Sequence, residues 1–193
     1  MKTAAVTLVI ALVVASAGIS SVSAASKARA LAHLTARNGQ PAGTASFIST
    51  SHGVLIEFDV KGLMPGPHAI HIHTSGNCDP KVAFTSAGPD LSFDQSKMHG
   101  FLAPHGPHPG DLPNEFAASD GTLHASVISN AISLGNGKKS IFDRDGASII
   151  IHAKADDYVS QPAGNSGDRV ACGVIERTVA PGSRKGGKRK AHT

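Results

Sequence analysis

The stretch His68-Ala69-Ile70-His71-Ile72-His73 decides how the rest of the sequence is interpreted. In a β-strand successive side chains point to opposite faces, so His71 and His73 share a face and lie about 6–7 Å apart. Ile70 and Ile72 then point into a core. Two imidazoles on one face of an apolar strand indicate a metal site, because neutral imidazole binds copper and zinc well. Two solvent-facing histidines are the alternative, and the remainder of the chain has to decide between them.

The N-terminus has the pattern of a secretory signal peptide. Lys2 precedes an apolar run from Ala4 to Ala17, and small residues end in Val22-Ser23-Ala24. A positive start, an apolar segment too short to span a bilayer and a small-x-small site predict cleavage after Ala24. Cleavage after Ala25 and an uncleaved membrane anchor are the alternatives. We therefore expect a periplasmic or secreted protein with one domain over residues 25–180.

The charge of the chain is concentrated at its C-terminus. Five of the 18 basic residues lie between Arg184 and Lys190, and Lys2 leaves with the signal peptide. The remaining 12 basic and 14 acidic residues give the body a net charge of −2. We interpret residues 181–193 as a basic, disordered tail and expect no nucleic-acid partner; weak attraction to anionic surfaces is a further hypothesis.

The chain contains 21 glycines, 11 prolines and no tryptophan, and short β-type runs recur between turn signals. The pattern predicts an all-β fold, an eight-stranded antiparallel Greek-key β-sandwich or flattened barrel. An Asp120-Gly121 turn predicts a hairpin between the fifth and sixth strands. The expected strands are Lys27–Leu34, Thr44–Thr50, Val54–Val60, His68–Thr74, Glu115–Ala118, Thr122–Val127, Ser148–His152 and Val170–Ile175.

Two long loops interrupt this pattern, residues 75–113 and residues 156–168. A loop of this length inside a compact domain is normally functional or disordered. The first loop contains His99, His108 and Asp111, so we interpret it as functional and held together by metal. His71, His73 and His152 on apolar strands are candidates for one site. Ligands of this kind without sulfur favour zinc or copper over iron–sulfur chemistry.

The two cysteines, Cys78 and Cys172, can pair in one way, which an oxidising compartment favours. A thiolate metal ligand is the competing interpretation. No second cysteine lies within the short spacing that a structural zinc site requires.

Six stretches of the chain, in order and near the expected spacing, resemble exported bacterial copper/zinc superoxide dismutases. They are His71-Ile-His73, Thr85-Ser-Ala-Gly-Pro89, Lys97-Met-His99-Gly100, His108-Pro-Gly-Asp-Leu112, Ile151-His-Ala-Lys-Ala-Asp-Asp157 and Gly164-Asn-Ser-Gly-Asp-Arg-Val-Ala-Cys-Gly-Val-Ile175.

The resemblance implies two metal cofactors, copper and zinc, and a role for each matching residue. It implies copper ligation by His71, His73 and His152, and zinc ligation by His99, His108 and Asp111. It further implies that Arg169 attracts and orients the superoxide anion, that Asp156 ties a copper-ligand histidine to a zinc-ligand histidine, and that Cys78 pairs with Cys172. Members of this family occur as monomers and as homodimers, and the sequence does not choose between them.

One residue departs from the family pattern. The position of the histidine that bridges the two metals is occupied by Asp90. A carboxylate bridge would require the metals to approach each other, so the sequence favours Asp90 as a zinc ligand only, with a bridging role as the alternative. His105 is a weaker candidate for a substitute ligand. We expect a superoxide dismutase whose turnover Asp90 reduces; the second hypothesis is a metal-buffering protein on the same fold.

Overall fold

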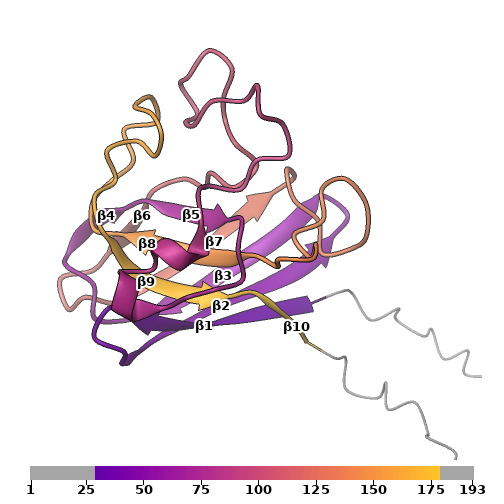
Figure 1. Cartoon of the computed structure of the whole chain (residues 1–193). Helices are drawn as coiled ribbons and strands as arrows, with labels where there is room; N and C mark the ends of the chain where they lie inside the picture. The colour runs from indigo at the N-terminus through magenta and orange to yellow at the C-terminus, as the bar shows by residue number, and fades with distance from the viewer. Residues whose placement is uncertain (1–28, 179–193) are drawn as a thin grey trace, which may run out of the picture.

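In the computed structural model the described part of the chain is residues 29–178. The expected signal peptide and basic tail lie outside these residues. An eight-stranded, wholly antiparallel sheet forms the body (Figure 1) and confirms the all-β class. Its spatial order is β5 (Ile70–His73), β8 (Ser148–His152), β9 (Arg169–Val174), β1 (Arg29–Ala36), β2 (Pro41–Thr50), β3 (Gly53–Val60) and β7 (Leu123–Ser129), with β10 (Glu176–Thr178) also paired to β1.

A second, two-stranded sheet corrects two expectations. The strand expected over His68–Thr74 is interrupted at Ala69, so that β4 (Gly66–His68) pairs with β6 (Glu115–Ala117) while β5 pairs with β8. The turn at Asp120-Gly121 forms, with a backbone bond of 2.7 Å from Ala118 N to Thr122 O. The prediction that the strands on either side of this turn pair with each other is nevertheless wrong, because β6 pairs with β4 and β7 pairs with β3.

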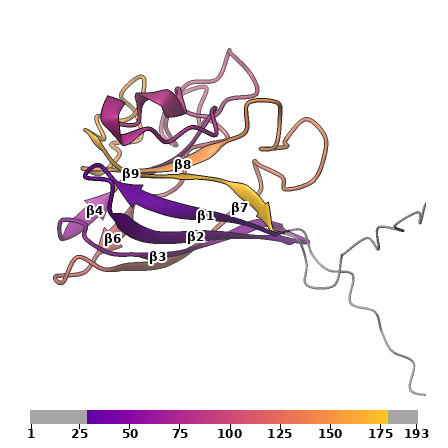
Figure 2. The ribbon, with the colours of Figure 1, turned by 60° about the horizontal axis from the view of Figure 1, so that its bottom comes forward.

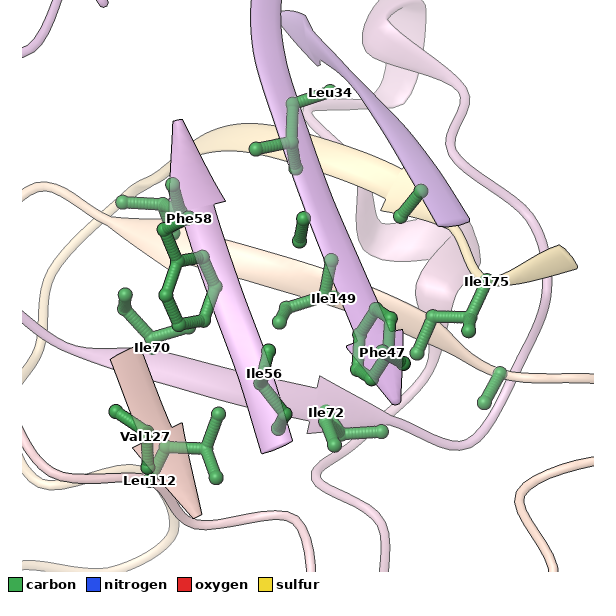
Figure 3. Packing of buried hydrophobic residues seen from close by; sticks show 14 of the residues in the cluster. Leu34, Phe47, Ile56, Phe58, Ile70, Ile72, Leu112, Val127, Ile149 and Ile175 are labelled. Atoms are coloured by element: carbon green, nitrogen blue, oxygen red, sulfur yellow. The ribbon is translucent and has the colours of Figure 1, made fainter. Parts of the chain in front are cut away.

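The sheet curls around an apolar core, which Figure 3 shows from close by. Alternation places Ile70 and Ile72 of β5 and Ile149 of β8 inside it, against Phe47 and Ile56 from the strands on the other side. Because the core takes every second residue of β5, His71 and His73 occupy the opposite face. Burial of this cluster is the main favourable term for the fold.

The two long loops project from the same side of the sheet (Figures 1 and 2). The first loop contains two short 3₁₀ turns, η1 (Pro80–Val82) and η2 (Thr85–Ala87). Both loops lie over the histidine-bearing face of β5 and β8, so His71, His73 and His152 are buried although they do not belong to the core. Among residues 29–178 no helix is long and apolar enough to cross a membrane.

Candidate metal centre

Three histidines meet on the outer face of β5 and β8. Cross-strand pairing sets His71 opposite Ile150 and His73 opposite Ser148, and His152 follows on the same face of β8. One ring nitrogen of each histidine lies within 4.8 Å of those of the others. These three side chains, expected at one copper site, are therefore brought together by strand geometry alone.

Each of the three rings has one nitrogen engaged and one free. His73 Nδ1 donates to the Gly88 carbonyl at 2.8 Å, and His71 Nε2 donates to Asp156 Oδ2 at 3.0 Å. His152 Nδ1 lies 3.0 Å from Ser166 Oγ. The opposite atoms, His71 Nδ1, His73 Nε2 and His152 Nε2, are buried and have no hydrogen-bond partner among the described residues. Such converging, unpaired nitrogens fit a metal ion, because outer hydrogen bonds normally fix the tautomer of a ligating histidine.

The first long loop returns to the edge of β5 and carries two carboxylates to it. Isolated β-bridges join His73 to Asp90 and His71 to Asp111. Leu91 N donates to Ile72 O at 2.8 Å, and Ile72 N donates to Gly110 O at 2.8 Å. A side chain at Gly110 would place its Cβ 2.3 Å from Ile72 O, so only glycine allows this approach.

A second cluster forms around His99, which is fully buried. His99 Nδ1 is 3.0 Å from Asp111 Oδ1 and 3.0 Å from Asp90 Oδ2. One atom each of His71, Asp90, His99 and Asp111 fall within 4.8 Å of one another. Nitrogen and carboxylate oxygen donors are the ligand chemistry of zinc.

His108 lies farther from the second cluster than the other expected zinc ligands. Its Nδ1 is buried without a hydrogen-bond partner among the described residues and lies 3.9 Å from Asp111 Oδ1. Its Nε2 faces the Lys97 carbonyl at 3.2 Å. The free Nδ1 therefore points toward the carboxylate of the cluster. His105 is exposed and belongs to neither group.

Asp156 lies between the two clusters. Its Oδ2 is 3.0 Å from His71 Nε2 and 3.0 Å from His99 Nε2. Asn114 fixes the Asp156 backbone, accepting from Asp156 N at 2.8 Å and donating to Asp156 O at 2.9 Å. A Cβ at Gly164 would overlap the Asp156 carboxylate, so glycine is required there.

Burial and neighbouring charges keep His73 and His152 neutral and Asp90 ionised, which are the forms in which these side chains bind a metal. Burial lowers the pKa of His73 to about 4 and that of His152 to about 3, so both rings stay neutral at pH 7. Burial alone would raise the pKa of Asp90, but the His99 hydrogen bond and the adjacent His71 and His73 lower it to about 2.

The pKa of His99 shifts in the opposite direction. Burial alone would lower it, but hydrogen bonds with Asp111, Asp156 and Asp90 raise the pKa of His99 to about 11. In the metal-free protein this imidazole is protonated, because the three neighbouring carboxylates stabilise its positive charge.

Arg169 faces the first cluster from the start of β9. Its guanidinium donates to Phe84 O at 2.7 Å and to Gly88 O at 2.8 Å. It lines an open cavity of about 280 Å³ together with His73 and His152. Gln161 and Asn165 of the second loop complete the rim. A small anion entering this cavity meets a cation directly beside two free imidazole nitrogens.

A disulfide secures the loop segment that positions Arg169. Cys78 and Cys172 are bonded, which confirms the expected pairing, and they are 94 residues apart in sequence. Buried Cys172 packs with Phe84, Ala87 and Ile150 in a small cluster separate from the main core. The bond thus ties the loop that supplies both Arg169 acceptors to β9, which carries Arg169 itself.

Three contacts of the centre were not anticipated from the sequence. Ser166 meets His152, the Gly88 carbonyl is shared by His73 and Arg169, and Gln161 clamps the His99 backbone through its side-chain amide. Gly88 and Ser166 lie inside stretches quoted above, but nothing in their residue types signals the contacts. His68, in contrast, is a structural histidine, because its two ring nitrogens meet the carbonyls of His152 and Met64.

Comparisons with known proteins agree with this geometry. Residues 41–175 match the family model described as copper/zinc superoxide dismutase (SODC). A Caulobacter vibrioides protein named superoxide dismutase [Cu-Zn] is 43% identical over 149 residues, covering 76% of this chain and 85% of the relative. The superoxide dismutase-like protein YojM of Bacillus subtilis is 40% identical over 129 residues, 66% of this chain and 65% of its own length.

A solved structure shows the same fold. A double mutant of a superoxide dismutase-like protein from Bacillus subtilis, in which two residues are replaced by histidine, has a TM-score of 0.71 and 38% identity to this chain. The matched region covers 75% of this chain and 95% of the Bacillus subtilis protein. The family expected from the sequence motifs is confirmed, and with it the two metals, copper and zinc. The chain belongs to the copper/zinc superoxide dismutase family.

Proposed function

We propose that this protein is a superoxide dismutase with copper held by His71, His73 and His152. Zinc is held by His99, His108 and Asp111, with Asp90 contributing a carboxylate. The observation that carries the proposal is the convergence of three unpaired, buried imidazole nitrogens beside an arginine-lined cavity. Copper, when bound, supplies a one-electron redox couple, which zinc lacks.

The residues of the chain account for the remaining requirements of the reaction. One superoxide gives up an electron and leaves as oxygen; a second gains that electron and two protons and leaves as hydrogen peroxide. Arg169 attracts each anion into the cavity and holds it next to the histidines, since its charge is fixed in place by the Phe84 and Gly88 carbonyls. Asp156 maintains the orientation of His71 and His99 throughout.

The direct test is superoxide decay with protein shown to contain one copper and one zinc per chain. We expect catalysis far above that of buffer. Arg169→Ala should lower kcat/KM about tenfold or more and weaken its dependence on salt, because steering of the anion is lost. Arg144→Ala removes an exposed guanidinium on a remote loop and serves as the matched control. A sample with one copper and one zinc per chain that does not accelerate superoxide decay would contradict the proposed enzymatic function.

Metal buffering is the second candidate, favoured by one specific observation. Asp90 stands where the family pattern has a bridging histidine. A protein of this kind would bind both metals tightly and leave superoxide decay at its uncatalysed rate. The same assay distinguishes the two functions, because metal content and turnover are measured on one sample.

We also propose that the protein is exported. The disulfide is favoured by an oxidising compartment, and a relative from Brugia pahangi, 36% identical over 157 residues, is named an extracellular superoxide dismutase. Mature protein isolated from the periplasm or medium should begin at Ala25. A chain that retains Met1 and stays with the cytosol would contradict export.

A further inference from the structure

The carboxylate of Asp90 lies between the two ligand clusters and presents a different oxygen to each. Asp90 Oδ1 is 3.3 Å from His73 Nε2 and 3.6 Å from His71 Nδ1, the two free nitrogens of the first cluster. Asp90 Oδ2 is 3.0 Å from His99 Nδ1 in the second. The residue is 8% exposed, so both oxygens are withdrawn from bulk water.

The distances at Oδ1 are those expected between atoms bound to one ion. Metal–ligand bonds of 2.0–2.2 Å at tetrahedral angles place neighbouring ligand atoms about 3.3–3.6 Å apart. The contacts to His73 and His71 are longer than an N–H···O hydrogen bond prefers, and the two nitrogens are unpaired among the described residues. Oδ1 therefore stands at ligand distance from two of the three copper histidines, His73 and His71.

The backbone keeps Asp90 in this place. Its β-bridge to His73 is flanked by hydrogen bonds from Thr74 N to Pro89 O and from Leu91 N to Ile72 O, at 3.0 and 2.8 Å. Residues on both sides of Asp90 are thus attached to the strand that carries His71 and His73. The backbone of Asp90 is thereby held beside His71 and His73, and from that position its carboxylate faces both clusters.

We propose that Asp90 is a ligand shared by both metals, with Oδ1 on copper and Oδ2 on zinc. This inference rests on the metal assignment of the proposed function, and it replaces the zinc-only role that the sequence favoured. A carboxylate offers one oxygen to each of two ions, so Asp90 can take the position of the bridging imidazole when the two metals lie closer together than an imidazole would hold them. The chain thus keeps the coupling of its metals while changing the chemistry of the group that couples them.

The decisive experiment is a crystal structure of the protein loaded with copper and zinc, with each ion identified by anomalous scattering at its own absorption edge. We expect Oδ2 about 2.0–2.2 Å from zinc and Oδ1 within bonding distance of copper. Oδ1 turned away from copper, with water in its place or with both oxygens on zinc, would overturn the shared ligand.

Electron paramagnetic resonance of Cu(II) gives a second readout in solution. Zinc-loaded wild type is compared with Asp90→Asn, and with Asp59→Asn, which neutralises an exposed carboxylate on β3. We expect a changed Cu(II) hyperfine splitting in Asp90→Asn only, since one oxygen ligand is lost. An identical spectrum would contradict the proposal. Turnover enters neither experiment, so a shared ligand in an inactive protein would overturn the proposed function alone.

Discussion

In the proposed dismutase, Asp90 is the residue whose chemistry bears most directly on turnover. An imidazole at this position can take up a proton when it leaves copper, whereas a metal-held carboxylate does so poorly. Asp90→His should therefore raise kcat for superoxide, with metal content unchanged. Stopped-flow measurement of superoxide decay gives kcat of the variant and of the wild type. A variant kcat equal to or lower than that of the wild type would mean that the surrounding site has adapted to the carboxylate.

Ser166 contacts His152, one of the three proposed copper ligands. With Nε2 free for copper, His152 Nδ1 donates to Ser166 Oγ at 3.0 Å, and the Gly167 carbonyl is farther away at 3.3 Å. Loss of such an outer contact typically weakens metal binding 10–100-fold. We expect Ser166→Ala to weaken copper binding about tenfold and to leave zinc unchanged, as measured by competition with a chelator.

Ser126→Ala on the exposed face of β7 is the control for this substitution. Equal copper affinity in Ser166→Ala and wild type would show that the Gly167 carbonyl alone orients His152.

At the scale of elements, the disulfide holds the first loop against β9. Replacing both Cys78 and Cys172 by alanine should lower the free energy of unfolding by about 4–5 kcal/mol, because a closed loop of this length restricts the unfolded chain. Denaturant titration measures the loss. We also expect kcat/KM to fall in folded, metal-loaded protein, since Phe84 and Gly88 no longer fix Arg169. Unchanged kcat/KM would assign the bond to stability alone.

Gln161 connects the two long loops through the backbone of His99, a proposed zinc ligand. It accepts from His99 N at 3.0 Å and donates to His99 O at 2.8 Å. Gln161→Ala should accelerate zinc release several-fold, about the effect expected when one supporting contact is lost. The exposed Gln40→Ala is the control. Identical release rates in both variants would show that the loops hold zinc independently.

The elements also show where sequence-based prediction succeeds and fails. Period-two alternation predicted the core face of β5, and hence which histidines lie outside it. It did not predict the break at Ala69, where backbone bonds with His152 and Lys154 replace a continuous strand. The pairing of β6 with β4 depends on contacts far apart in sequence, which a local turn signal does not encode.

At the scale of the whole molecule, the metal-free protein should be most stable near pH 6.5. His73 and His152 have folded pKa values of about 4 and about 3, below the unfolded 6.5. As the pH falls below 6.5 the unfolded chain binds more protons, and stability drops by about 1.4 kcal/mol per pH unit for each histidine. Asp90, with a folded pKa of about 2, keeps its contribution until the pH falls below 3.8.

His99 gives the opposite slope on the alkaline side. Its folded pKa of about 11 makes its contribution complete below pH 6.5 and progressively lost as the pH rises toward 11. Urea unfolding of the metal-free protein across pH 4–10 should show an acid limb about twice as steep as the alkaline limb. His33→Gln, at an exposed position, should leave the profile unchanged; a flat acid limb in wild type would contradict buried neutral histidines.

The whole centre could be predicted only in part, for a physical reason. The types of ligand and their order follow from residue identities. His71, His73 and His152 were therefore predicted to share one site, and the structure places them together. The position of Asp90 between the clusters depends on how the first loop returns to β5, through bonds such as Leu91 N to Ile72 O. Neither composition nor spacing specifies that return.

The Gly88 carbonyl accepts from both His73 Nδ1 and the Arg169 guanidinium. The expected copper ligand His73 and Arg169, the group proposed to receive the substrate anion, thus donate to a single oxygen atom. Displacing this carbonyl would disturb the ring and the guanidinium together, so the first loop controls both side chains through one atom.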